Sequence, residues 1–265
     1  MDLGLEGKRA IVTGASRGIG LAVARSLAAE GVDVVLAARS AEALELAATS
    51  LGNETGRRVV AVATDTGDDE SVRSLVARTV AELGGVDILV NSAATPWSAG
   101  ASRDLAATTD EVVRDEVEIK VLGYLRTARA VAPHLVAQGW GRIVNISGLG
   151  ARQANSIAQT VRNVSVAALT KNLADELGPR GVNVTVVHPG LTRTERLRDR
   201  LAAQSVESGI PVAELEAALA TNSIRRIIDA AEVADVVTFL ASPRSVGITG
   251  DAVAVGGGVP GPVYY

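Results

Sequence analysis

Residues 13–20 read TGASRGIG, and this stretch decides the fold that we predict. It follows a short apolar run at residues 9–13 and precedes a helical pattern over 18–30, which Gly31 ends. Glycines in such a turn allow a tight bend and a close approach of a ligand to the backbone. The free N–H groups at the start of the following helix suit a pyrophosphate. Many strand-to-helix turns need glycine anyway, but the order of strand, turn and helix favours nucleotide binding.

Outward from this turn, strand and helix patterns alternate along the whole chain. Strands are expected over 32–37, 58–63, 86–90, 141–147, 182–187 and 252–255, and helices over 41–51, 68–83, 108–138, 155–177 and 231–241. Strands that are continuous apolar runs are buried on both faces. We therefore predict one α/β domain over residues 1–265, a Rossmann-type doubly wound parallel sheet of about seven strands in three αβα layers. Residues 194–227 break the rhythm, and we expect them to form a helical lid over the ligand cleft.

The composition narrows the classes of function. The chain has 265 residues, 47% of them hydrophobic, and a net charge of −4, which fits one globular domain and argues against nucleic acid as a partner. With no cysteine and two histidines we expect no disulfide and no metal site. The first residues lack a basic start followed by an apolar run, and no run of 18 apolar residues is free of charge. We therefore expect a cytoplasmic protein without a membrane span.

Further motifs extend this pattern to the rest of the chain. They are NSAA at 91–94, GRIVNIS at 141–147, PG at 189–190 followed by Thr194, FLAS at 239–242 and ITG at 248–250. Together with TGASRGIG they resemble the short-chain dehydrogenase/reductase family, and within it the 3-oxoacyl-carrier-protein-reductase-like members. The resemblance implies a nicotinamide-dependent oxidoreductase with a small-molecule substrate. It also implies a homo-oligomer, a tetramer or dimer, paired through the helices predicted at 108–138 and 155–177.

The cofactor is expected at the turn and at the matching family motifs. The residues predicted to hold it are Gly14, Ser16, Arg17, Gly18, Ile19, Gly20, Arg39, Asp65, Thr66, Asn91, Ala93, Pro189, Gly190 and Thr194. An NAD enzyme usually ends its second strand with an acidic residue. Here Arg39 stands at that end, and with Arg17 it offers two cations to a 2′-phosphate, so we favour NADP(H) over NAD(H). Both arginines could instead be solvated surface residues, and Asp65 could instead cap a helix.

The catalytic positions depart from the family pattern. Family members use Asn, Ser, Tyr and Lys, and the Tyr hydroxyl exchanges the proton as hydride moves. Three segments resemble family motifs and fix these positions: NVSVAALTKNLA at 163–174, GRIVNIS at 141–147 and IKVLG at 119–123. The first puts Gln159 at the Tyr position and Asn163 at the Lys position. The second puts Gly148 at the Ser position, with Ser147 beside it, and the third puts Lys120 at the Asn position. Neither amide is a useful proton donor, and losing a positioned general acid costs about 10²–10⁴ in rate.

Three residues near the cleft offer a replacement for the lost acid. Lys120, partly buried near an oxidised nicotinamide, would have its pKa lowered toward neutrality, or it could pair with Glu116 four residues earlier on the helix surface. His188 could donate a proton near pH 7, or be a satisfied residue at a strand end. Ser147 could orient a substrate oxygen, or serve as a turn residue.

Other side chains suggest weaker possibilities. Tyr124 is expected to face the core or a helix partner, whereas Tyr264 and Tyr265 end the chain and could reach a neighbouring subunit's cleft. Arg152 and Arg162 lie near the altered Tyr and Lys positions and could hold an anionic group of a substrate.

Three hypotheses about function follow. We favour an NADP(H)-dependent oxidoreductase with a rebuilt proton path that uses Lys120, with Ser147, Gln159 and Asn163 around it. The intact glycine turn and the Pro-Gly motif with Thr194 favour it. The alternatives are a non-redox lyase, isomerase or cyclase on the same scaffold, and a non-catalytic cofactor-binding subunit.

Overall fold

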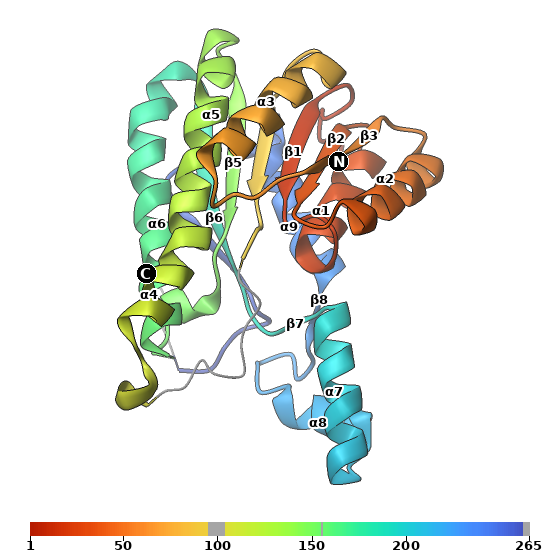
Figure 1. The fold of residues 1–265 in the computed structure, drawn as a ribbon, viewed down its shortest axis with the longest axis vertical. Coiled ribbons are helices and arrows are strands. Elements are labelled where there is room, and N and C mark those ends of the chain that lie inside the picture. The colour runs from red at the N-terminus through yellow and green to blue at the C-terminus, as the bar shows by residue number, and fades with distance from the viewer. Residues whose placement is uncertain (95–103, 155, 262–265) are drawn as a thin grey trace.

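A seven-stranded parallel sheet forms the centre of the molecule. The computed structural model describes residues 1–94, 104–154 and 156–261. The strands, in the order β3-β2-β1-β4-β5-β6-β9, are all parallel to their neighbours. They are β1 (Arg9–Thr13), β2 (Asp33–Ala38), β3 (Val59–Ala63), β4 (Ile88–Asn91), β5 (Gly141–Ile146), β6 (Val182–Pro189) and β9 (Ala252–Val255). With helices on both faces (Figure 1), the predicted Rossmann-type fold is confirmed.

Each face of the sheet has its own apolar cluster, which makes the three layers. Helices α1 (Gly18–Ala29), α2 (Ala41–Thr55) and α9 (Ala230–Ala241) cover one face, and α3 (Asp69–Leu83), α5 (Gly123–Ala137) and α6 (Ile157–Leu177) cover the other. On β1, Val12 packs into the first cluster and Ile11 into the second. Because both faces are buried, these strands are continuous apolar runs in the sequence. Each fully buried aliphatic side chain contributes about 1.5–3 kcal/mol.

Helix α2 continues beyond its predicted end. We expected it to stop near residue 51, but it runs to Thr55 and ends at Gly56, whose φ is 68°. Gly52 lies inside the helix, where glycine costs only about 1 kcal/mol relative to alanine. The helix therefore ends at the first glycine that adopts the left-handed conformation.

The long helix predicted over 108–138 is present, but it contains an irregular turn. Helix α4 (Asp110–Val117) is followed by a π-helical turn at Glu118–Leu122 and then by α5. Such wide turns insert an extra residue into a helix and are frequent at functional sites. Lys120 lies at the centre of this turn, so the turn decides which way its side chain points. Short 3-10 turns occur at Leu105–Ala107, Leu149–Ala151, Gly178–Arg180 and Pro243–Ser245.

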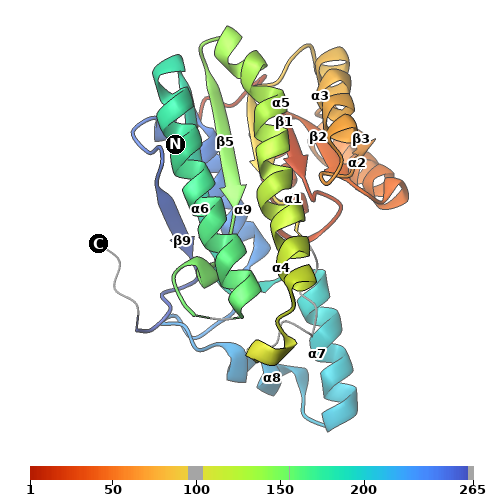
Figure 2. The same ribbon diagram turned by 60° about the vertical axis from the view of Figure 1, so that its left-hand side comes forward.

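Helices α7 (Glu195–Ser208) and α8 (Val212–Leu219) project from one end of the body (Figure 1; Figure 2). They stand between two short paired strands, β7 (Thr192–Arg193) and β8 (Ile228–Asp229), and have a small apolar cluster of their own. Arg193 forms ion pairs with Glu216 and Asp229, and these tie the base of the projection together. The helices expected within 194–227 are therefore present. Across the described part of the chain, no helix is both long and apolar enough to cross a membrane.

Candidate active site

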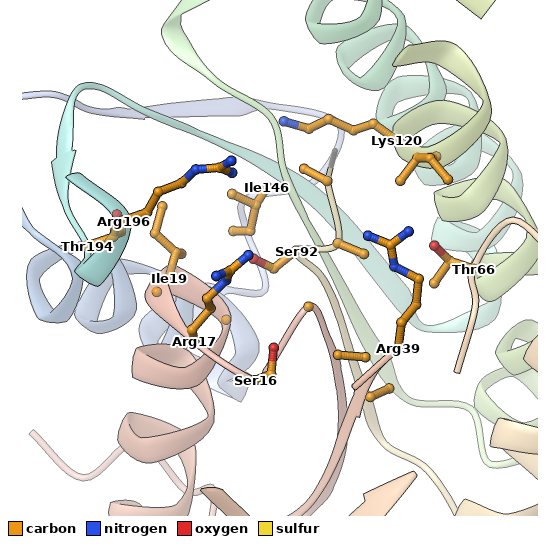
Figure 3. A pocket seen from close by; sticks show the side chains of 18 of the residues that line it. Ser16, Arg17, Ile19, Arg39, Thr66, Ser92, Lys120, Ile146, Thr194 and Arg196 are labelled. Atoms are coloured by element: carbon orange, nitrogen blue, oxygen red, sulfur yellow. The ribbon is translucent and has the colours of Figure 1, made fainter. Parts of the chain in front are cut away.

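A cavity of 710 Å³ opens at the carboxyl ends of the parallel strands. Its wall is built from the turn after β1, the ends of β2 to β6, the π-helical turn, α6 and the start of α7 (Figure 3). The chain leaves β1 toward β2 and later returns to β4 on the other side of β1. Open parallel sheets bind ligands at such a switch point, so the fold itself places a ligand site here.

The glycine turn packs so closely that side chains would not fit. Gly14 has a φ of +68°, and a Cβ on it would lie 2.8 Å from both the Ala93 nitrogen and the Ser92 oxygen. Helix α1 behind the turn has no side-chain cap at Arg17. Its first N–H groups are therefore available to an anion, as a pyrophosphate site requires.

An acidic side chain from α7 already occupies part of this anion site. The Gly18 N–H donates to a carboxylate oxygen of Glu195 at 3.0 Å. A carboxylate at a helix N-terminus is drawn there by the same partial positive charge that attracts a phosphate. The contact supports the expectation that this turn holds anions. Sequence reasoning missed Glu195, although its position directly after Thr194 was visible.

Two arginines line the other end of the cavity, where the adenosine half of a dinucleotide would lie. Arg17 and Arg39 both extend into the cavity in Figure 3. Neither forms an ion pair within the described ranges, and β2 ends at Ala38 without an acidic residue. Two guanidinium groups of this kind suit the binding of a phosphate group.

All but one of the predicted cofactor residues line the cavity. Those that do are Gly14, Ser16, Arg17, Gly18, Ile19, Gly20, Arg39, Asp65, Thr66, Ala93, Pro189, Gly190 and Thr194. The side chain of Asn91 is completely buried. Its amide nitrogen donates to Asn145, and its side-chain oxygen accepts from the Thr127 hydroxyl. The expected contact of Asn91 with a cofactor is therefore not supported, since buried amides are held by such internal bonds.

Asp65 and Thr194, which both line the cavity, differ in whether they cap a helix. Asp65 does not cap α3, because Asp68 accepts from the N–H groups of Glu70 and Ser71 at that helix start. The carboxylate of Asp65 instead accepts from Gly67 at 2.9 Å, beside the cavity. Thr194 caps α7 while it lines the cavity.

Lys120 is a buried amine in the cavity wall, with 5% of its surface exposed. Its Nζ donates to the Ser147 carbonyl oxygen at 2.7 Å and to Asn163 Oδ1 at 3.3 Å. Burial lowers the pKa of Lys120 well below its ordinary value, the positive charge of Arg162 lowers it further, and the negative charge of Glu116 opposes both. A lowered pKa makes the Lys120 ammonium a stronger acid than an ordinary lysine, which suits proton transfer.

The pairing of Lys120 with Glu116, one of our two expectations, was wrong. Glu116 instead forms a buried ion pair with Arg162 of α6. The physical reason is the wide turn at 118–122, which takes Lys120 off the row of side chains that recurs every fourth residue in an α-helix. Lys120 consequently points to the end of β5 rather than back along its own helix.

Ser147 and Asn163 form the rest of this polar group. The Ser147 hydroxyl donates to the Asn163 carbonyl oxygen at 3.0 Å, and Ser147 lines the cavity. A Cβ on Gly148 would lie 3.3 Å from the Asn163 amide nitrogen, so a larger residue there would press on Asn163. Gln159 is buried one turn before Asn163 and is not among the residues that line the cavity.

His188 does not have the surroundings of an acid that works at pH 7. It is 1% exposed and its Nδ1 is buried without a partner. Burial, together with the positive charges of Arg152 and Lys120, lowers the pKa of His188 to about 4. The imidazole is therefore neutral at pH 7, and the expected proton donation near that pH is not supported.

The tyrosines offer no described replacement for the lost hydroxyl. Tyr124 is buried and donates to the Ile146 carbonyl oxygen at 3.0 Å, and burial raises its pKa above the ordinary value. Tyr264 and Tyr265 lie outside the described residues. Nor do the described His, Asp and Glu residues form a group that could hold a metal ion.

Fold and site together define a Rossmann-type nucleotide-binding protein. A family model described as enoyl-(acyl carrier protein) reductase matches residues 14–260. The chain belongs to the short-chain dehydrogenase/reductase family of oxidoreductases.

Individual relatives and solved structures agree with this assignment. The short-chain reductase protein NovJ of Streptomyces niveus is 34% identical over 254 residues, which cover 95% of this chain and 93% of that one. The L-sorbose reductase of Gluconobacter frateurii, solved with NADPH and L-sorbose, superposes with a TM-score of 0.93 at 31% identity, over 99% of this chain and 100% of that one. An NADPH-bound short-chain oxidoreductase of Pseudomonas aeruginosa PAO1, described as containing an atypical catalytic center, superposes with a TM-score of 0.88 at 31% identity, over 97% and 98% of the two chains.

Proposed function

We propose that this protein is an NADP(H)-dependent oxidoreductase that acts on a carbonyl or alcohol group of a small molecule, with Lys120 as the group that exchanges the proton. The observation that carries the proposal is the Lys120 amine itself, which is buried in the cavity wall and, among the described residues, donates hydrogen bonds to uncharged acceptors. The bound cofactor would supply or accept the hydride, as the family's chemistry requires.

The residues at the cofactor end fit NADP(H). Gly14 allows the backbone to approach a pyrophosphate, and the uncapped start of α1 offers N–H groups to it. Arg17 and Arg39 would bind the 2′-phosphate, because guanidinium groups suit phosphate geometry. The two solved neighbours named above hold NADPH, which supports the same preference.

At the catalytic end, the hydrogen-bonding positions of the Lys120 nitrogen define its proposed role. Two of its N–H bonds are used by Ser147 and Asn163. One position remains for a substrate oxygen in the cavity, a third N–H when the amine is charged and a lone pair when it is neutral. In reduction the N–H bond breaks as an O–H bond forms on the substrate, and oxidation reverses this transfer. Ser147 and Asn163 would hold the amine in position, with Gln159 packed one turn away on α6.

The projecting segment 194–227 would act as a lid in this reaction. Its support is the contact of Glu195 with Gly18 and the position of Arg196 in the cavity wall, both from the first turn of α7. We further propose a homo-oligomer formed through α4 to α6, which carry exposed apolar side chains. These exposed apolar side chains are Val112, Leu122, Ile157, Val161 and Val164.

Cofactor preference is tested by calorimetric titration of the protein with NADPH and with NADH. We expect micromolar binding of NADPH, and a loss of roughly 10–100-fold in Arg39→Ala, the value of one charge-assisted contact. Binding of NADH should change little in the same variant. Arg25→Ala is the matched control, because Arg25 pairs with Glu54 on the surface and is not a cavity residue. Equal affinity for both nucleotides in the wild type would contradict the preference.

Turnover is tested with a panel of aldehydes and ketones in the presence of NADPH. Lys120→Met should lower kcat by about 10²–10⁴, the usual effect of losing a general acid. Lys171→Met is the control, since Lys171 is exposed and pairs with Asp175. Tight NADPH binding without turnover of any carbonyl would contradict the oxidoreductase and favour the non-redox enzyme or the non-catalytic subunit.

A further inference from the structure

A second buried charged group lies next to Lys120. Glu116 of α4 and Arg162 of α6 form an ion pair in which each side chain is 10% exposed. The pair uses one guanidinium nitrogen, Nη1, and the Arg162 Nε is buried without a partner. Burying an ion pair is costly, and such pairs often gain little stability over apolar packing.

The charged and titratable groups around Lys120 come from every element packed against it. The charges of Glu116 on α4 and Arg162 on α6 act on Lys120. The charges of Lys120 and of Arg152, after β5, act on His188 of β6, and the charge of Arg162 acts on Tyr124 of α5. Among these described groups Glu116 is the one carboxylate. Its negative charge acts on Lys120, although the wide turn takes the lysine off the four-residue row, so Glu116 is the candidate counter-ion.

Arg162 takes this counter-ion away from Lys120. The Glu116 carboxylate is bound by the guanidinium group, and the Lys120 amine is bound by two uncharged oxygens, from Ser147 and Asn163. Arginine is suited to this task because it stays charged when buried and binds carboxylates strongly.

We propose that Arg162 is a positioning residue that holds the Glu116 carboxylate and so leaves the Lys120 amine without a counter-ion at the cavity wall. The proposal rests on the proposed role of Lys120 in proton exchange. A lysine with a counter-ion would be held in its charged form, and its ammonium group would give up a proton less readily. Without the counter-ion, the amine gives its proton more readily to a substrate oxygen, and it takes another proton from water after the product leaves.

The chain allows a direct test, because it contains three lysines, Lys8, Lys120 and Lys171. Lysine labelled with ¹³C at Cε gives three NMR signals, and Lys120→Met identifies the one that belongs to Lys120. The chemical shift of that signal against pH then measures the protonation of the Lys120 amine without any turnover. Signals from Lys8 and Lys171, which lie elsewhere on the surface, report whether each variant is folded.

In Arg162→Gln the charge of the Glu116 carboxylate is no longer balanced by a guanidinium group, so it acts more strongly on Lys120. We expect the titration midpoint of Lys120 to rise by about one pH unit or more, the usual effect of an opposite charge nearby. Glu116→Gln should move it in the opposite direction, because the one favourable charge is lost. Arg162→Lys keeps a cation for Glu116 and should lie close to the wild type. Asp175→Asn, which removes the partner of Lys171, is the matched control and should leave Lys120 unchanged.

If Arg162→Gln leaves an unpaired buried carboxylate and fails to fold, the double variant Glu116→Gln/Arg162→Gln removes both charges. Its midpoint should lie between those of the two single variants. A Lys120 midpoint that is the same in Glu116→Gln, the double variant and the wild type would overturn the proposal. A fall in the titration midpoint of Lys120 in a folded Arg162→Gln variant would also overturn the proposal.

The two proposals can fail separately. When the midpoints move as expected but no carbonyl is turned over, Arg162 controls Lys120 and the oxidoreductase proposal fails. When turnover depends on Lys120 but the midpoints do not move, the oxidoreductase stands and the role of Arg162 is wrong. In an active enzyme, the pH profile of kcat in Arg162→Lys should match that of the wild type.

Discussion

At the scale of single residues, the proposed active site exchanges an amine and an amide between two positions of the family pattern. An amine stands at Lys120, where the family has an amide, and an amide stands at Asn163, where the family has an amine. The structure brings the two side chains into hydrogen-bond contact at 3.3 Å. An amine and an amide therefore still meet at the same place, although each comes from the other helix.

His188 carries a prediction about stability in acid. Its pKa in the folded protein is about 4, below the ordinary value of 6.5. Between these values the unfolded chain binds a proton that the folded protein does not, so the free energy of unfolding falls as pH falls from 6.5 to 4. The contribution is at most about 3 kcal/mol, and it is fully present above pH 6.5.

Urea unfolding at pH 7, 5.5 and 4.5 measures this effect. In His188→Leu the loss of stability across this range should be smaller than in the wild type. His134→Gln serves as the control, because it replaces an exposed histidine on α5. Parallel curves for His188→Leu and the wild type would rule out this role for His188.

At the scale of elements, two departures from regular structure shape the site. The wide turn between α4 and α5 redirects Lys120, and the projection of α7 brings Glu195 to the glycine turn. Neither the wide turn nor the projection of α7 can be predicted from the spacing of apolar residues, because that spacing reports only that a segment is helical. The helices and strands themselves were largely predictable from the sequence. Helix α2 is longer than predicted because it continues through Gly52 to Thr55.

Helix α7 carries a prediction about cofactor affinity. A bound pyrophosphate would compete with the Glu195 carboxylate for the Gly18 N–H. Glu195→Gln removes the negative charge and should tighten NADPH binding by roughly 2–10-fold, the value of one such hydrogen bond. Calorimetric titration measures it, with Glu207→Gln at the exposed far end of α7 as the control. Weaker binding in Glu195→Gln would mean that the carboxylate assists the cofactor.

At the scale of the whole molecule, the exposed apolar stripe of α6 bears on assembly. Ile157, Val161 and Val164 recur on one face of α6 and are 44%, 41% and 46% exposed. Helices α4, α5 and α6 lie along the same side of the body in Figure 2. A second copy of the chain would cover this face in the proposed homo-oligomer.

Size-exclusion chromatography with light scattering measures this assembly. We expect a dimer or tetramer for the wild type and a shift toward the monomer in Val161→Asp, because an unpaired charge in an apolar interface is costly. Val206→Asp is the control, since Val206 is 88% exposed on α7. A monomeric wild type, or an assembly that Val161→Asp leaves intact, would contradict the proposal.

The sequence by itself determined the layers of the fold and led to the proposals for the glycine turn and the catalytic positions. These follow from local patterns: apolar runs, glycines at a strand end, and motifs at fixed spacing. Only the tertiary structure decided that Glu116 binds Arg162 rather than Lys120, that Asn91 is held inside the core, and that His188 is buried. Partner choice and burial depend on which elements pack together, because competing charges and desolvation act between residues far apart in the chain.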